Sequence, residues 1–225
     1  MGDTPQERVL PPYNREVILS LRHFIVEEVR SARRFLRRVD RSIDIDTLTF
    51  YPMGKHADAA QFERYLREAS AAGADMGVIS EAGCPAVADP GADVVAIAQR
   101  RGFRVVPLVG PSSMIMAVMA SGLNGQSFAF NGYLPIDASE RTKRLRQLEE
   151  RALHEGQTQL FIETPYRNAK LFATLLQTLR PQTRLCIAAG ITTADEWIHT
   201  HRVSEWRHAT LPDLSKTPAI FLFGR

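Results

Sequence analysis

Short apolar runs alternate with amphipathic segments along most of this sequence, and this alternation limits the possible folds more than any other feature. In the first half, the runs expected to form strands are 24–26, 43–51, 76–79 and 105–109. The segments expected to form helices are 13–21, 30–41, 59–72, 92–100 and the stretch that begins at Ser113. Strands separated by helices of this length pair in parallel through right-handed crossovers. The first half is therefore predicted to be an α/β unit.

The second half begins at Gly122-Leu123-Asn124-Gly125, which has the composition of a hinge. Strands are expected at 128–133, 160–162, 185–189, 197–203 and 219–223, and helices at 141–154 and 168–179. The last strands follow one another without an intervening helix, so part of this sheet is expected to be antiparallel. We predict an α/β protein of two domains, residues 1–124 and 125–225, with a cleft between them.

Composition indicates an ordinary globular protein. The 225 residues are 44% hydrophobic and 24% charged, which excludes a disordered or fibrous chain. Cys84 and Cys186 lie far apart, so neither a disulfide framework nor a zinc motif is expected. The first residues lack the features of a signal peptide, and no apolar run approaches the roughly 20 residues of a membrane helix. A cytoplasmic protein without a membrane segment is predicted.

The formal net charge is only +3, but its distribution is uneven. Six arginines and one acid lie between residues 30 and 41, at helical spacing: Arg30, Arg33, Arg34, Arg37, Arg38 and Arg41. Apolar residues occupy the opposite face of the same expected helix. The arginines form either a solvated basic face or a surface that follows phosphates, since arginine forks match phosphate oxygens.

Three loops that follow expected strands carry the residues best suited to bind a ligand, because open α/β sheets bind ligands at the carboxyl ends of their strands. Loop 80–91 holds Gly83 and Gly91, which permit close backbone approach, and prolines that stiffen it. The second loop, 110–113, offers serines that either cap the next helix or face a ligand. The third loop, 163–167, is charged.

Common cofactor and nucleophile motifs are absent. The sequence contains no G-x-G-x-x-G after a strand, no G-x-x-x-x-G-K-[ST] and no G-x-S-x-G. His199 and His201 have no third ligand at motif spacing, so no metal site is expected. Cys84 has no base paired with it in the sequence. The residues alone therefore predict a ligand-binding α/β protein of two domains.

Five motifs, taken in order, resemble those of a known family. They are E-E-V-R (27–30), S-E-A-G-C-P-A-V-A-D-P-G (80–91), V-P-L-V-G-P-S-S (106–113), G-Y-L-P (132–135) and F-I-E-T-P-Y-R (161–167). The chain resembles the tetrapyrrole methylase superfamily, the class III S-adenosylmethionine-dependent methyltransferases. It is most similar to the branch that methylates a ribose 2′-hydroxyl of small-subunit ribosomal RNA.

The resemblance implies two α/β domains, a homodimer, and S-adenosyl-L-methionine held between the domains. The cofactor-binding residues that it implies are Gly83, Cys84, Pro85, Val87, Ser112, Ser113, Phe161, Ile162, Ala189, Ile191, Thr217, Pro218, Ala219 and Ile220. A ribose hydroxyl is a weak nucleophile, and the candidate bases are Glu28, Glu81 and Glu163, each equally suited to pair with a neighbouring arginine. Arg30, Arg33, Arg34, Arg37 and Arg167 are expected to bind RNA phosphates.

The chain departs from the family pattern at several points. Val29 and Tyr166 stand where the ribosomal RNA branch has threonine and histidine, and Cys84 stands where the porphyrin-methylating branch has aspartate. The sequence starts about where the family's first strand and its loop would end, so we expect that strand to be missing from the N-terminal domain. Two alternatives stay open: a methyltransferase acting on a tetrapyrrole or other small molecule, and a non-catalytic module that binds RNA or protein.

Overall fold

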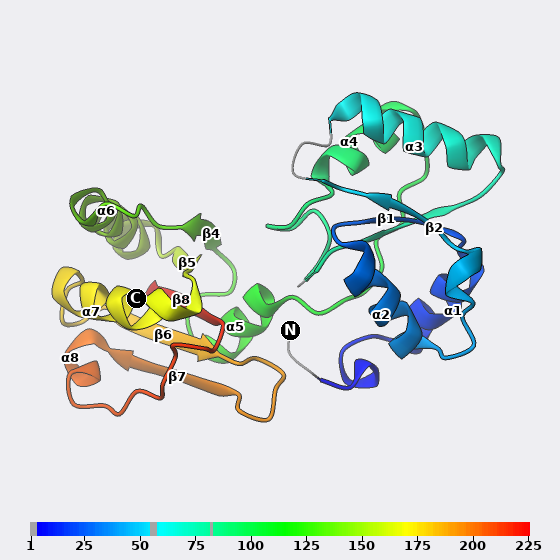
Figure 1. Ribbon diagram of the computed structural model, residues 1–225. Helices are drawn as coiled ribbons and strands as arrows, with labels where there is room; N and C mark the ends of the chain where they lie inside the picture. The colour runs from blue at the N-terminus through cyan, green and yellow to red at the C-terminus, as the bar shows by residue number, and fades with distance from the viewer. Residues whose placement is uncertain (1–3, 55–57, 82) are drawn as a thin grey trace. The chain divides into compact units, whose positions relative to one another are not determined.

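The computed structural model describes residues 4–54, 58–81 and 83–225, and these residues form two compact units, 4–111 and 112–225 (Figure 1). The start of the chain, where the family's first strand is expected to be missing, lies outside the described residues. In the N-terminal unit the elements are η1 (Gln6–Arg8), α1 (Pro12–Ser20), β1 (His23–Val26), α2 (Val29–Val39), η2 (Ile45–Thr47), β2 (Thr49–Pro52), α3 (Ala59–Ala71), β3 (Met76–Ile79) and α4 (Ala92–Arg100).

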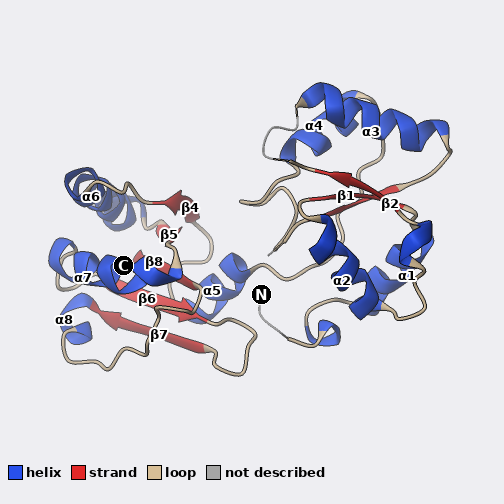
Figure 2. Cartoon of the chain, viewed as in Figure 1, coloured by secondary structure: helices blue, strands red, loops and turns tan. Residues whose placement is uncertain are grey.

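The N-terminal unit is a parallel sheet between two layers of helices. Its strands lie in the order β2-β1-β3, and both pairings are parallel, as expected. Side chains alternate across β1, so Phe24 and Val26 pack with α1 and α2, whereas Ile25 packs with α3 and α4. Figure 2 shows these two helix layers on opposite faces of the sheet. The carboxyl ends of all three strands therefore lie at one edge.

Two expected strands differ from the structure. Residues 105–109 form no regular secondary structure, and Val106 and Val109 are 52% and 73% exposed. Apolar character alone does not make a strand, because a strand needs a partner for its backbone groups. Among the described residues, β3 pairs only with β1, and residues 105–109 do not add a strand to the other edge of β3. In the expected strand 43–51, only the end pairs, because Asp44 accepts a hydrogen bond from Asp46 N at 3.1 Å and starts η2.

The elements of the C-terminal unit are α5 (Ser113–Ser121), β4 (Phe128–Tyr133), α6 (Ala138–Glu155), β5 (Thr158–Ile162), η3 (Pro165–Arg167), α7 (Asn168–Thr178), β6 (Arg184–Ala189), β7 (Trp197–Arg202), α8 (Val203–Trp206) and β8 (Ala219–Gly224). The strand order is β4-β5-β8-β6-β7. The β4–β5 pairing is parallel and the others are antiparallel, which confirms the predicted mixed sheet.

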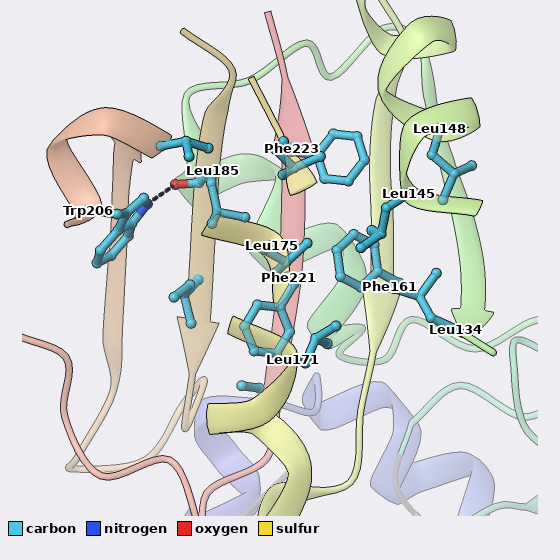
Figure 3. Packing of buried hydrophobic residues seen from close by; sticks show 14 of the residues in the cluster. Leu134, Leu145, Leu148, Phe161, Leu171, Leu175, Leu185, Trp206, Phe221 and Phe223 are labelled. Carbon is cyan, nitrogen blue, oxygen red and sulfur yellow. Dashed lines mark hydrogen bonds between the residues drawn. The ribbon is translucent and has the colours of Figure 1, made fainter. Parts of the chain in front are cut away.

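The main core of the C-terminal unit lies between this sheet and the helices α6, α7 and α8 (Figure 3). The Phe161 and Phe221 rings stack there with centroids 6.0 Å apart. Trp206 closes one side of the core, and its indole Nε1 donates a hydrogen bond of 2.8 Å to the Leu185 carbonyl. These aromatic side chains are among the largest that are fully buried in the protein, and their burial stabilises the unit.

The division between the units falls before α5 rather than after Asn124, where the hinge was expected. Ala117 and Val118 of α5 are buried against Leu160, Cys186 and Leu222 of the second sheet. Burial of this apolar face joins α5 to the C-terminal unit, and the glycines at 122 and 125 connect α5 to β4 within it. In the described part of the chain, no helix is both long and apolar enough to cross a bilayer.

Candidate active site

The loop after β3, residues 80–91, has a strained and internally bonded backbone in the part that is described, which omits Ala82. The amide N of Ala86 donates to the Pro90 carbonyl at 3.1 Å, and Val87 N donates to the Cys84 carbonyl at the same distance. Ala86 and Ala88 have φ of +68° and +58°, a left-handed conformation that costs an alanine roughly 1–2 kcal/mol. Strain of this kind is concentrated at ligand-binding sites. The loop is therefore the first candidate for a cofactor contact.

Contacts from neighbouring segments fix this loop. Cys84 is half-buried, with its Sγ 3.5 Å from the Pro111 carbonyl oxygen. Asn14 Nδ2 in turn donates a 2.7 Å hydrogen bond to the Val109 carbonyl and ties that segment to α1. Gly83, Pro85 and Val87 lie exposed on the loop surface. The four predicted cofactor residues of this loop therefore lie together on an anchored loop, three of them open to solvent.

Glu81 lies at the carboxyl end of β3. Its backbone N donates a 3.1 Å hydrogen bond to the carboxylate of Glu27, and Glu27 N donates to the Ile79 carbonyl at the end of β3. The Glu81 side chain is exposed and forms no hydrogen bond or ion pair with any described residue. Sequence reasoning missed Glu27, although it lies in a quoted motif, because its partner is 54 residues away. Glu81 thus has a positioned backbone and an available carboxylate.

Glu28 caps helix α2. Its carboxylate accepts hydrogen bonds from Arg30 N at 2.8 Å and Ser31 N at 2.7 Å. These two backbone hydrogen bonds are the largest cause that lowers the pKa of Glu28. A carboxylate whose charged form is stabilised in this way is a weaker base, and accepting a proton would remove the cap. The geometry therefore makes Glu28 the N-cap of α2.

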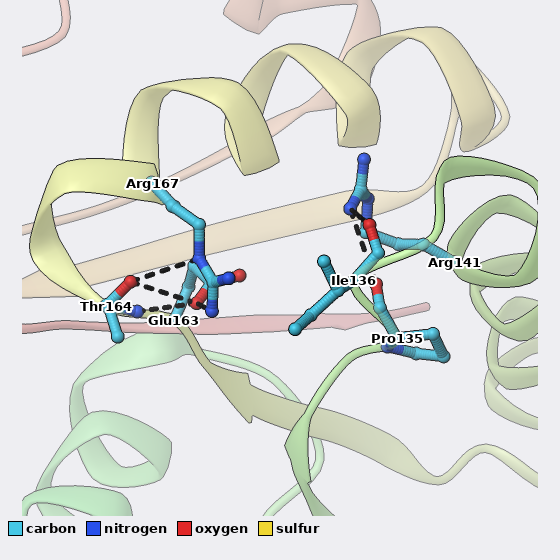
Figure 4. A network of polar contacts seen from close by, with 6 residues as sticks. All are labelled: Pro135, Ile136, Arg141, Glu163, Thr164 and Arg167. Carbon is cyan, nitrogen blue, oxygen red and sulfur yellow. Dashed lines mark hydrogen bonds and ion pairs between the residues drawn. The ribbon is translucent and has the colours of Figure 1, made fainter.

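Glu163 pairs with an arginine (Figure 4). Its side chain is only 7% exposed, and Oε1 accepts hydrogen bonds from Arg167 at 2.6 Å and Thr164 N at 2.7 Å. The hydrogen bond from Arg167 to Glu163 is the main cause that raises the pKa of Arg167. Of the two roles open to Glu163, the structure shows the ion pair. Arg167 forms this pair while its side chain remains 29% exposed.

The arginines of α2 line an open hollow of about 400 Å³. Arg33, Arg34, Arg37 and Arg38 surround it, together with Ile45 and Asp46. Ala32 and Leu36 on the opposite face of the helix are buried, which confirms the predicted amphipathic helix. The helix ends at Val39, so Arg41 lies beyond it, and Arg30 is exposed near its start. A second hollow, of about 520 Å³, is lined only by α6 residues and contains no predicted site residue.

The predicted cofactor residues of the C-terminal unit fall into three groups. Ser112 caps α5 by accepting a 3.5 Å hydrogen bond from Ile115 N, and Ser113 follows it as the first helical residue. Phe161 is fully buried in the core between the sheet and α7, so its side chain is closed to a ligand. Residues buried or half-buried in the two core clusters are Ile162, Ala189, Ile191, Ala219 and Ile220.

The third group, Thr217 and Pro218, leads into β8 and remains accessible. The Thr217 carbonyl accepts a 3.0 Å hydrogen bond from Nδ2 of the buried Asn168, and the Pro218 carbonyl accepts one of 3.1 Å from Gly190 N. Pro218 is exposed and Thr217 half-buried. Asn168 was not predicted, because its contact with residue 217 depends on tertiary packing.

Two α/β units, the first with a strained loop at the carboxyl edge of a parallel sheet, define a ligand-binding protein of the two-domain α/β class. The family described as tetrapyrrole (corrin/porphyrin) methylases matches residues 15–206. The chain belongs to this family.

Relatives and solved structures refine this assignment. Over 205 residues the chain is 29% identical to "Ribosomal RNA small subunit methyltransferase I" of Vibrio cholerae. These residues are 91% of this chain and 66% of that protein. It is 35% identical over 133 residues to the protein of the same name from Pseudomonas aeruginosa, covering 59% of this chain and 46% of that one. The chain thus spans about half to two thirds of the length of these relatives.

Two solved structures share the fold at 17% identity, and both cover 97% of this chain. The methyltransferase CobJ has a TM-score of 0.62 and 89% of its own chain covered. Uroporphyrin-III C-methyl transferase from Thermus thermophilus, solved with S-adenyl homocysteine, has a TM-score of 0.52 and 92% of its chain covered.

Proposed function

We propose that this chain transfers a methyl group from S-adenosyl-L-methionine to a ribose 2′-hydroxyl of small-subunit ribosomal RNA. The observation that carries the proposal is the 205-residue similarity to the Vibrio cholerae protein, whose name states a ribosomal RNA substrate. The arginine-lined hollow on α2 favours RNA over a tetrapyrrole, because four guanidinium groups at one site suit a chain of phosphates. A homodimer in the cytoplasm remains the expectation from the family resemblance.

The residues on loop 80–91 fit the cofactor. Gly83 and nearby Gly110 have little or nothing within 4 Å of an added Cβ, so a ligand can approach the backbone at both positions. Gly83, Cys84, Pro85 and Val87 are the residues of the N-terminal unit that would hold the cofactor. The cofactor supplies a methyl group on a positively charged sulfur, already activated for displacement.

The protein's own contribution is alignment and proton removal. Orienting two reactants can lower a reaction barrier by roughly 7–11 kcal/mol. An anchored loop contributes to this effect because it holds the cofactor in one orientation. Glu81 is the proposed base, because its carboxylate is available whereas those of Glu28 and Glu163 are occupied. Its role is to accept the proton of the ribose hydroxyl as the oxygen attacks. The α2 arginines hold the RNA backbone.

The direct test is methyl transfer from a radiolabelled donor to small-subunit ribosomal RNA, followed by mapping of the label. We expect label on a ribose oxygen. Transfer to uroporphyrinogen but not to RNA would instead support a small-molecule methyltransferase, and absence of both transfer and donor binding would support a non-catalytic module.

Protection of Cys84 from a thiol reagent tests whether the cofactor binds at loop 80–91. Bound S-adenosylhomocysteine should slow the reaction of Cys84 about tenfold at ten times its Kd. Cys186 is the internal reference, since it is fully buried and burial raises the pKa of its thiol.

Charge reversal on α2 tests the RNA-binding surface. Changing Arg33, Arg34 and Arg37 together to Glu is expected to lower RNA affinity more than tenfold. The slope of log K against the logarithm of the salt concentration should also become less steep, by about 0.7–0.9 for each phosphate that is no longer neutralised. The matched control changes Arg64, Arg67 and Arg100 to Glu, which alters the net charge equally on the layer formed by α3 and α4. Equal decreases in both variants would indicate a general charge effect and remove α2 from the substrate site.

A further inference from the structure

Two tyrosines are exposed where the parallel strands β4 and β5 end. Tyr133 is 60% exposed and Tyr166 is 73% exposed, both far above the level of a core aromatic residue. Tyr133 lies beside Ile162 in the strand register, and Tyr166 follows four residues later in η3. Both rings therefore extend from the same end of the sheet. Exposed aromatic rings gathered at one place indicate an interaction surface.

Hydrogen bonds and an ion pair hold the two loops that carry or follow these tyrosines (Figure 4). Arg141 is buried, and its guanidinium donates to the carbonyls of Pro135 and Ile136 at 3.3 and 2.9 Å, which fixes the loop after Tyr133. The Glu163–Arg167 ion pair of 2.6 Å fixes the loop that carries Tyr166. Backbone that is ordered before binding lowers the entropy cost of the interaction.

Positive charge lies beside the rings. The Arg167 guanidinium carbon is 5.6 Å from the centroid of the Tyr166 ring, within the range of a cation–π contact. Both tyrosines contribute to the raised pKa of Arg167, after the larger effect of Glu163, so both phenol groups lie within its electrostatic range. Arg144 also points toward β4, where it donates a 3.2 Å hydrogen bond to Asn131. The guanidinium group of Arg167 thus lies beside the Tyr166 ring, and that of Arg144 lies against β4.

We infer that Tyr133 and Tyr166 form a stacking platform for unpaired RNA bases, with Arg167 beside them. Tyrosine faces stack on any base, and arginine binds phosphate or stacks on the base plane, which is how proteins recognise single-stranded RNA. A protein partner would also use exposed tyrosines, but the adjacent guanidinium groups favour a polyanion. The inference rests on the proposed function and names the residues that hold the substrate's bases. Tyr166 is one of the positions at which this chain departs from the ribosomal RNA branch.

The test compares binding of a single-stranded oligoribonucleotide that carries 2-aminopurine to the full chain and to variants. The double variant Tyr133→Leu/Tyr166→Leu is expected to bind about 5- to 150-fold more weakly for each base that no longer stacks, with less quenching of 2-aminopurine. The double variant with Phe at both positions keeps the rings and should bind within about twofold of the wild type. Tyr13→Leu is the matched control, because Tyr13 is also 60% exposed but lies in the N-terminal unit.

Unchanged binding and quenching by the leucine variant would overturn the platform, and so would equally weakened binding in the leucine and phenylalanine variants. Preference for a duplex over the single strand would also contradict it. Thermal unfolding midpoints equal to that of the wild type establish that the variants fold. Wild-type protein that stacks the oligonucleotide but methylates no ribosomal RNA would refute the proposed function and keep the platform. Normal methylation and normal RNA binding by the leucine variant would refute the platform and keep the proposed function.

Discussion

Replacing Glu81 by glutamine is expected to lower kcat for methyl transfer by about 10²–10⁴-fold, the contribution typical of a general base. The amide is nearly the same size and cannot accept the proton of the ribose hydroxyl. Affinity for the cofactor should be unchanged, because the backbone hydrogen bond from Glu81 N to Glu27 does not involve the substituted group. Single-turnover rates with labelled donor and calorimetry with S-adenosylhomocysteine measure the two quantities separately.

Two further variants make this result specific. Glu16→Gln replaces another exposed carboxylate of the same unit and should leave kcat unchanged. Glu28→Ala removes the two capping hydrogen bonds of α2 and should lower the unfolding midpoint. If Glu81→Gln keeps full activity while a variant of Glu163 becomes inactive without a decrease in stability, the assignment of the base to Glu81 is wrong.

Replacing Phe161 by alanine is expected to reduce the free energy of unfolding by about 3–5 kcal/mol. The side chain is fully buried and packs against the rings of Phe221 and Phe223, at centroid distances of 6.0 and 5.6 Å, so alanine leaves a cavity between the sheet and its helices. Urea unfolding measures the decrease, and an unchanged m value would show that the unfolded state is unaffected.

The same position separates a core role from a ligand contact. Phe161→Leu retains most of the buried volume and should cost much less stability than alanine, with cofactor affinity equal to that of the wild type. A leucine variant that is as stable as the wild type yet fails to bind S-adenosylhomocysteine would contradict the assignment of Phe161 to the core.

Several parts of the fold could be predicted because their causes are local. Helix α2 was predicted with both its faces, since helical periodicity and the hydrogen bonds of a helix involve residues three or four apart. The loops at the strand ends were also predicted, because glycine and proline mark them in the sequence. The strained alanines at 86 and 88 were not predicted, because no sequence signal marks a left-handed alanine.

The sequence predicted which residues belong to the candidate site but not which role each of them has. Glu28, Glu81 and Glu163 had equal standing in the sequence, since each closely follows an expected strand. Only the folded loops show that Arg167 occupies Glu163 and that the Glu81 carboxylate remains available. The exposed pair Tyr133 and Tyr166 is also a product of the fold, because the parallel pairing of β4 and β5 brings residues 33 positions apart to one edge.

Sequence patterns were sufficient to predict the order and type of most elements, the amphipathic arginine helix and the family to which the chain belongs. Whether an apolar residue lies in a strand, in the core or at the surface depended on packing between distant segments. Residues 105–109 are as apolar as β5, yet they pair with no strand in the described part of the chain. Phe161 faces the core because the strand alternates its side chains against α7. A helix satisfies its backbone within its own segment, whereas a strand and a buried ring depend on partners that the rest of the chain must bring to them.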